Sequence, residues 1–314
     1  MYRPHLRLFL LLLLSTATFP LSGCLFRTRT LDRQFSDRPL KSATQQELID
    51  YVSTQAAKIQ SMQATVDIDS SAGDPKNGRI TDYKEIRGYV LARKPALLRM
   101  IGLLPIVRNR AFDMVSNGSG FELWIPPKNK FIIGPNEVAK PSPNPLENLR
   151  PQIILDALLF RPVQPDEIAV LEVRTRVLTD EESEKHLQQS NYILDIIRNG
   201  PASEDRYLSR KIYFNRANLL PYRQLIFNKA GEVQTDAQYT GFKDFGGVRF
   251  PTHIMIQRPQ EEYTIGLRII KLTFNQPLNP DQFVLPRPPG AQVVRLDGSQ
   301  PSASNSGDAT LGVE

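Results

Sequence analysis

The sequence predicts an α+β protein that is mostly β, with a large antiparallel sheet that curls into a barrel or half barrel. Consecutive strand patterns cover residues 83–127, and seven more follow at 168–177, 191–198, 207–215, 222–228, 233–242, 249–257 and 263–274. Two stretches, which begin at residues 44 and 151, carry helical patterns. Regular short strands separated by turn sequences are typical of such barrels.

Alternation defines the strands of residues 83–127. Ile86, Gly88, Val90 and Ala92 alternate with Arg87, Tyr89, Leu91 and Arg93, the period of two that places side chains on opposite faces of a strand. Pro95 ends this strand because it has no N–H to donate. A second run begins at Leu97, Asn117-Gly118 marks a turn, and residues 121–125 resume the strand before Pro126-Pro127 stops it. The pattern predicts a meander.

The first helix is predicted to begin at a capping box. Thr44 can accept a hydrogen bond from the N–H of Glu47 while the Glu47 carboxylate reaches back. Apolar residues follow at three- and four-residue spacing and so share one face: Leu48, Val52, Ala56, Ile59 and Met62. Residues 64–68 then alternate as the first strand, and residues 74–78 are a loop by composition.

The second helix is predicted over residues 151–160. Its apolar residues point all round the helix: Ile153, Ile154, Leu155, Ala157, Leu158, Leu159 and Phe160. Asp156 is the only charge inside it, and Pro151 suits its first turn. A helix of this kind must be buried on several sides.

The N-terminus has the pattern of a processing segment. Arg3 and Arg7 precede the apolar run 8–14, which is too short to span a bilayer. Residues 21–24, Leu-Ser-Gly-Cys, resemble the lipobox of bacterial lipoproteins, which implies that residues 1–23 are a signal peptide and that Cys24 carries a covalent diacylglycerol and an N-acyl chain. The alternative is an ordinary secretory signal or a stray cysteine that carries no lipid.

Lipid on Cys24 implies attachment to a membrane. Several acyl chains on one residue give stable anchoring, whereas a single chain binds only marginally. By analogy with lipoprotein sorting, Leu25 after the lipidated Cys24 predicts the periplasmic face of the outer membrane, with the inner membrane as the alternative. Residues 24–41 are predicted to be anchor and linker; their basic residues either attract anionic headgroups or belong to a solvated tether.

The order of motifs along residues 83–127 resembles the LolA/LolB-like superfamily of periplasmic lipoprotein carriers and receptors. The matching residues are Gly88, Arg93, Pro95, Leu98, Arg99, Gly118, Leu123, Trp124 and Pro126. Lys94, inserted between Arg93 and Pro95, departs from the family's corner motif. The resemblance covers about residues 44–289 and implies an unclosed antiparallel half barrel with helices covering its concave face.

The resemblance also implies site residues. A lid helix places Ile153, Ile154, Leu158 and Leu159 at the cavity, with Trp124 as a further cavity residue; the alternative is a plain core helix. In LolB-like receptors a loop with an apolar tip helps to pass lipoproteins into the bilayer, and Leu103, Leu104 and Ile106 are the corresponding candidates here. The alternative is that residues 103–107 complete a core strand.

Catalytic and nucleic-acid functions find little support in the sequence. Cys24 is the only cysteine, so an internal disulfide and a cysteine-based metal site are excluded. His186 and His253 have no second metal ligand at useful spacing. Loss of residues 1–23 removes Arg3 and Arg7 from 39 basic residues, leaving 37 against 33 acidic ones. Because these basic residues are scattered, no nucleic-acid footprint is predicted.

The predicted function is therefore binding rather than catalysis. Residues 42–296 form a half-barrel domain that shelters lipid or lipoprotein acyl chains, and residues 297–314 form a polar, disordered tail. The expected partners are membrane lipid, other lipoproteins or a periplasmic carrier, and no cofactor or metal is expected. The alternative is an envelope sensor or scaffold of the same fold that binds a protein partner.

Overall fold

The computed structural model describes residues 40–74, 79–136, 150–179, 186–200 and 205–296. The predicted signal peptide, Cys24, the linker up to residue 39 and the predicted tail 297–314 lie outside the described residues. The chain divides into two compact units, of which the larger comprises residues 38–176 and 190–314. The sites described below lie wholly in this larger unit.

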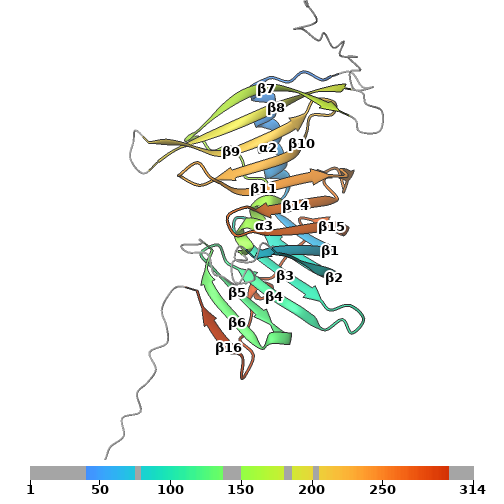
Figure 1. The fold of residues 1–314 in the computed structure, drawn as a ribbon, viewed down its shortest axis with the longest axis vertical. Coiled ribbons are helices and arrows are strands. Elements are labelled where there is room, and N and C mark those ends of the chain that lie inside the picture. The colour runs from blue at the N-terminus through green and yellow to red at the C-terminus, as the bar shows by residue number, and fades with distance from the viewer. Residues whose placement is uncertain (1–39, 75–78, 137–149, 180–185, 201–204, 297–314) are drawn as a thin grey trace, which may run out of the picture. The chain divides into compact units, whose positions relative to one another are not determined.

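A single 14-stranded sheet contains most of the strands (Figure 1). Its order is β16-β6-β5-β4-β3-β2-β1-β15-β14-β11-β10-β9-β8-β7, so the sheet is unclosed. The bounds are β1 (Ser61–Asp74), β2 (Arg79–Arg93), β3 (Leu97–Leu103), β4 (Arg110–Ser116), β5 (Gly120–Ile125), β6 (Lys130–Pro135), β7 (Glu167–Thr179), β8 (His186–Asn199), β9 (Arg206–Asn215), β10 (Leu220–Phe227), β11 (Val233–Thr240), β14 (His253–Arg258), β15 (Tyr263–Phe274) and β16 (Gln292–Arg295). Two short strands, β12 (Lys243–Asp244) and β13 (Arg249–Phe250), pair separately.

The predicted meander is confirmed as β2 to β5, and each of the seven later strand runs has a counterpart in the structure. The run 249–257 is interrupted, because β13 ends at Phe250 and β14 begins at His253. Pro251, between them, has no N–H to donate to the ladder.

The C-terminal strand β16 was not predicted. Its four residues pair in parallel with β6, whereas the other pairings described are antiparallel. Before β16 the chain passes through a 3₁₀ turn, η3 (Pro280–Phe283), and the segment that follows it. β16, and not that segment, forms one edge of the sheet.

Two α-helices occur in the described part of the chain, α2 (Gln45–Lys58) and α3 (Pro151–Leu158). The predicted capping box of α2 is confirmed, because the Thr44 side chain accepts from the Glu47 N–H at 3.2 Å and Glu47 Oε2 accepts from the Thr44 N–H at 2.7 Å. Hydrogen bonds from the backbone N–H and the hydroxyl of Thr44 to the Glu47 carboxylate lower the pKa of this exposed group. Met62, predicted on the helix face, lies in β1, because α2 already ends at its C-cap Ile59.

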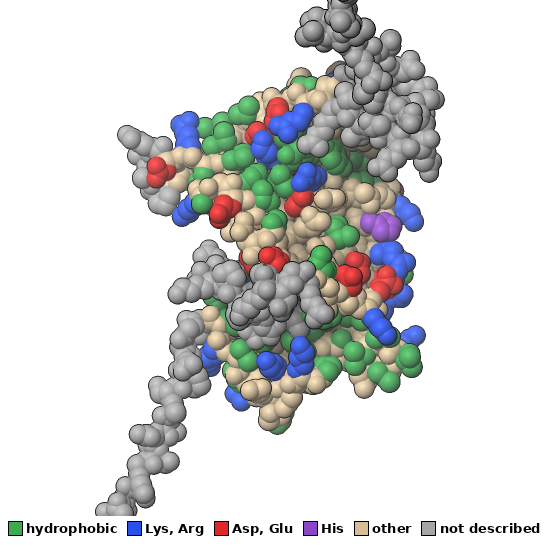
Figure 2. Space-filling view, in the orientation of Figure 1, with side chains coloured by type: hydrophobic (Ala, Val, Ile, Leu, Met, Phe, Trp, Pro, Cys, Tyr) green, Lys and Arg blue, Asp and Glu red, His purple; other side chains and the backbone are tan. Residues whose placement is uncertain are grey.

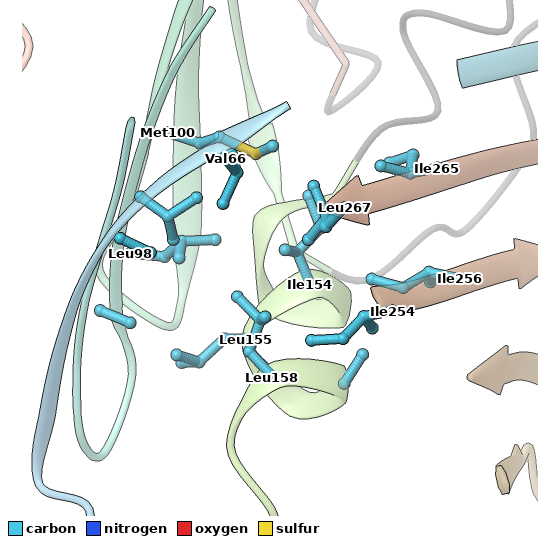
Figure 3. Packing of buried hydrophobic residues seen from close by; sticks show 14 of the residues in the cluster. Val66, Leu98, Met100, Ile154, Leu155, Leu158, Ile254, Ile256, Ile265 and Leu267 are labelled. Atoms are coloured by element: carbon cyan, nitrogen blue, oxygen red, sulfur yellow. The ribbon is translucent and has the colours of Figure 1, made fainter. Parts of the chain in front are cut away.

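Each helix buries one part of the sheet. Leu48 and Val52 of α2 pack in a cluster with Tyr192, Leu194 and Phe214 of β8 and β9. α3 packs in the largest cluster, between side chains from β1 and β3 and side chains from β14 and β15 (Figure 3).

Candidate functional site

An apolar pocket of about 380 Å³ lies among strands β1 to β5, β15 and the helix α3. Twelve of its lining residues are apolar: Ile68, Ile86, Met100, Leu104, Pro105, Ala111, Phe112, Met114, Leu123, Ile125, Ile154 and Ile265. Ser70, Tyr83 and Lys84 complete the lining. Lys84 is the only charged residue of the lining, so the pocket suits an apolar ligand.

Two glycines face each other beside the pocket. Gly88 of β2 and Gly102 of β3 are directly paired. A Cβ at position 102 would overlap the Phe112 ring and the end of the Ile86 side chain, and a Cβ at 88 would overlap the end of Ile68. Glycine at these two positions therefore leaves room for the side chains of Ile68, Ile86 and Phe112, which line the pocket and which a larger residue would displace.

The helix α3 contributes to the pocket through Ile154. Figure 3 shows it between Val66, Leu98 and Met100 on one side and the isoleucines of β14 and β15 on the other. Two hydrogen bonds hold it: the Tyr239 hydroxyl donates to the Ala157 carbonyl at 3.0 Å, and Gln224 Nε2 donates to the Asp156 carbonyl at 3.3 Å. Burial raises the pKa of the Tyr239 phenol, which keeps it a neutral donor.

The other residues predicted for a lid lie in different places. Leu158 and Leu159 are buried and line a separate cavity of only about 20 Å³ beside Tyr51 of α2. Ile153 is partly buried against the same large cluster. Of the four predicted lid residues, the structure thus places Ile154 at the apolar pocket.

The structure contradicts the prediction that Trp124 lines the cavity. It packs with Val115, Phe131, Leu285 and Ala291 in a separate cluster and does not line the apolar pocket. Its neighbour Leu123 does line the pocket, and successive side chains of a strand point to opposite faces. The prediction followed the motif and overlooked this alternation.

A loop between β3 and β4 borders the pocket. β3 ends at Leu103, and Leu104 and Pro105 line the pocket. Beyond them Ile106 is 98% exposed and Val107 62% exposed. Residues 103–107 therefore do not complete a core strand: Leu103 ends one, and an apolar loop tip follows it.

The backbone of this loop is strained. Ile106 has φ 70° and Arg108 has φ 53°, in the left-handed region that a β-branched residue rarely adopts. The loop is held by its own hydrogen bonds, from the Leu104 N–H to the Asn109 carbonyl at 2.7 Å and from the Arg108 N–H to the Leu104 carbonyl at 3.0 Å. An exposed isoleucine in such a conformation gains nothing from packing, so strain of this kind is a reason to seek a function.

The two arginines of the predicted corner motif are structural. Arg99 makes a bidentate ion pair with the fully buried Asp113, at 3.0 and 2.8 Å, and donates to the Gln282 carbonyl at 2.9 Å. Arg93 donates to the Leu278 carbonyl at 2.8 Å and lies over the Phe283 ring. These bonds tie the segment around η3 to β2 and β3.

Several pocket residues were not predicted. Ile86 lies on a strand whose alternation was recognised, so its inward direction was accessible from the sequence. Phe112 and Met114 lie on β4, within the predicted meander, where no alternation was identified. Ile265 comes from β15, which pairs with β1 although about 200 residues separate the two strands in the sequence. Its position at the pocket has no local sequence signal.

Side chains that could bind a metal ion do not cluster in the described residues. No group of three or more His, Asp, Glu or Cys residues that could hold a metal ion occurs there. On the face that Figure 2 shows, basic and acidic side chains are interspersed. Neither described helix combines the length and apolar character needed to cross a membrane.

The sequence matches no protein-family model and no curated protein. Three solved structures are similar to the fold at a TM-score of 0.45 each. They are a LolA superfamily protein from Nitrosomonas europaea, with 14% identity over 78% of this chain and 99% of that one; a proposed outer membrane lipoprotein-sorting protein domain from Vibrio parahaemolyticus, with 9% identity over 76% and 97%; and a DUF1329 family protein from Desulfovibrio piger, with 11% identity over 76% and 95%. At these identities and TM-scores the likeness carries no function across to this chain.

Proposed function

We propose that the chain is a non-enzymatic lipid-binding protein with a half-barrel sheet, and that the apolar pocket among β1 to β5 holds an acyl chain of a lipid or lipoprotein. The pocket itself is the observation that supports this. Its volume of about 380 Å³ falls within the range of about 300–1,000 Å³ common for ligand sites. Each methylene removed from water contributes about 0.8 kcal/mol, so such a ligand needs no catalytic residue to bind.

The proposal places the protein at a bilayer. Lipid on Cys24 would anchor it at the periplasmic face of the outer membrane, and the exposed tip at Ile106 and Val107 would enter the lipid surface. Leu104 and Pro105 line the pocket just before this tip. A loop that borders both an acyl site and the bilayer suits the sorting or insertion of lipoproteins.

Filling the pocket tests the proposal. Ala111 lines it, so Ala111→Trp places an indole ring in the space that the acyl chain would occupy. Ile270→Trp is the matched control, because Ile270 is an exposed residue of β15 that does not line the pocket. Each full-length protein would be purified in mild detergent, and its non-covalent lipid would be extracted and quantified by mass spectrometry per mole of protein.

We expect the wild type and Ile270→Trp to retain lipid, and Ala111→Trp to retain at least about tenfold less, since several buried methylenes are lost. The covalent chains on Cys24 would not be extracted and so would not obscure the difference. Equal lipid in all three proteins would refute the acyl site.

A second candidate function is an envelope sensor or scaffold that binds a protein partner. The observation in its favour is β7, which forms one edge of the sheet and exposes Ile168, Val170 and Val173. Backbone groups on an edge strand can pair with a strand of another protein. Val170→Lys places a charge on this exposed edge, which disfavours pairing with another strand, and loss of a stoichiometric partner without loss of lipid would favour the scaffold function.

A further inference from the structure

A second, polar pocket of about 320 Å³ lies on the other side of α3. Asp156 of the helix lines it, whereas Ile154 lines the apolar pocket. Residues two apart on an α-helix point about 200° away from each other. The two pockets are therefore separate, and nothing in the proposed acyl site accounts for the polar one.

Three arginines line the polar pocket. Arg210 of β9 is buried, at 2% exposed, whereas Arg198 of β8 is 32% and Arg161 is 44% exposed. All three approach one carboxylate, that of the buried Glu167, at 3.3, 3.2 and 3.8 Å respectively. The three arginines line the pocket, whereas Glu167 does not.

The pocket therefore carries surplus positive charge. Three guanidinium groups share the single charge of Glu167. The only acid in the lining is Asp156, whose pKa is raised by burial, although a hydrogen bond from Gln152 opposes this shift. Burial, and next the nearby charge of Arg161, lower the pKa of Arg210 to about 10. The arginines thus repel one another, and a bound anion would relieve that repulsion.

Unused hydrogen-bonding capacity lies at the same place. Arg210 donates to the carbonyls of Arg161 and Pro162, at 2.8 and 3.2 Å, but its buried Nε has no acceptor among the described residues. The buried Gln224, which also lines the pocket, has a side-chain oxygen without a donor in the same part of the chain. Buried polar atoms are normally paired, so a donor and an acceptor here indicate a ligand with both functions.

We propose that this pocket binds a phosphate group, in the form of a phosphomonoester that carries a small hydroxylated organic group. Guanidinium groups match phosphate oxygens through paired N–H donors. The negative charge of a phosphomonoester balances the surplus of positive charge, and Gln224 Oε1 offers an acceptor to a ligand hydroxyl. The volume exceeds what one phosphate needs, which leaves room for the organic group.

Isothermal titration calorimetry on the purified full chain tests the site, at constant ionic strength. The probes are inorganic phosphate, glycerol 3-phosphate and the soluble short-chain lipid dihexanoyl phosphatidic acid. Arg161→Gln combined with Arg198→Gln removes the two partly exposed guanidinium groups and leaves the Arg210–Glu167 pair intact. Arg268→Gln is the matched control: Arg268 is 45% exposed and pairs with Asp67 and Glu85.

We expect glycerol 3-phosphate to bind the wild type and the Arg268 variant alike, and the double variant to bind at least about tenfold more weakly. Binding of the phosphatidic acid alone, if it is lost in the double variant and kept in Ala111→Trp, supports the site with a lipid headgroup as its source. Binding of inorganic phosphate or glycerol 3-phosphate supports a ligand from solution. Ala111→Trp should leave all these affinities unchanged, so failure of the acyl proposal would not affect this one. The proposal is overturned if no probe binds the wild type, if the double variant binds like the wild type, or if Arg268→Gln weakens binding equally.

Discussion

The parts of the sheet under the two helices differ in how they are filled. Beneath α2, Leu48 and Val52 meet Tyr192 and Phe214, and the cavity beside that helix is only about 20 Å³. Beside α3, the strands β1 to β5 leave about 380 Å³ open. A cavity of the first size holds about one water molecule, and the second is of ligand size.

The difference lies in the residues that point toward each helix. The strands under α2 contribute the aromatic rings of Tyr192 and Phe214. The lining of the apolar pocket also includes the rings of Tyr83 and Phe112, but at Ser70 and Ala111 its strands carry small side chains. The same sheet can therefore pack densely, and we attribute the open space to these small residues.

Truncating an aromatic ring on each side tests this comparison and has the largest expected effect. Phe214→Ala should lower the free energy of unfolding by about 3–5 kcal/mol, because it leaves a cavity in a filled cluster. Phe112→Ala should cost only about 1–2 kcal/mol, because Phe112 is partly buried and already borders open space. Denaturant unfolding measures both values. Equal losses would mean that the two regions are equally packed.

A substitution at the tip of the loop beside the pocket should weaken membrane binding without lowering the stability of the protein. Ile106→Asn removes an exposed apolar side chain and places at φ 70° a residue that tolerates this conformation. Unfolding free energy should stay constant or rise by up to about 1 kcal/mol as the strain is relieved. Binding to vesicles should weaken by about tenfold.

The vesicle measurement is best made on the full chain carrying Cys24→Ser, so that anchored acyl chains do not mask the loop. Ile80→Asn is the control, since Ile80 is also exposed but lies outside this loop. A large loss of stability in Ile106→Asn would show that the loop tip is packed.

The stability of the protein should depend on the N-cap of α2, Thr44. Thr44→Ala removes the acceptor for the Glu47 N–H and should cost about 1 kcal/mol in unfolding free energy. Thr54→Ala, in the exposed middle of the same helix, is the control and should cost nothing. Circular dichroism during thermal unfolding compares them; equal melting temperatures would show that the cap contributes no stability.

The smallest expected effect on the unfolding free energy comes from the carboxyl group of Asp156 on α3. Burial raises the pKa of Asp156 above its ordinary value, so the folded state holds this proton more tightly than the unfolded state. The resulting stability is present at low pH and is lost as the pH rises through the folded-state pKa. Asp156→Asn has no such charge and should therefore gain stability relative to the wild type as the pH rises from about 4, near the ordinary aspartate pKa, toward neutrality.

Denaturant unfolding across this pH range measures the gain, with Asp50→Asn on the exposed face of α2 as the control. If the difference between Asp156→Asn and the wild type does not change with pH, the pKa of Asp156 is not raised in the folded state.

Local patterns were sufficient for most elements. The alternation from Ile86 onward predicted β2, and the Thr44 and Glu47 pair predicted the start of α2. The apolar helix after Pro151 was predicted to be buried on several sides, and α3 lies between two groups of strands. These elements depend on residues close together in the chain, so a single sequence carries the information.

Other features depend on contacts that a single sequence does not reveal. The four residues of β16 are too few for a period of two to stand out, and their partner β6 lies about 160 residues earlier. The convergence of Arg161, Arg198 and Arg210 on Glu167 requires the pairing of β8 with β9. The loop tip was recognised as a candidate, but its exposure depended on where β3 ended.

The pairing of β1 with β15 has a consequence for biosynthesis. Met62 lies opposite Phe274, so a chain made from its N-terminus must wait for some 200 further residues before β1 gains its second neighbour. Until then β14 and β15 are missing, so the apolar face of the early meander is incompletely covered. In the folded protein these two strands pack against the side of α3 that faces away from β1 and β3. Contacts this distant slow folding. The nascent protein therefore passes through a long period in which it is prone to aggregate, and neither half of the sequence should fold when expressed alone.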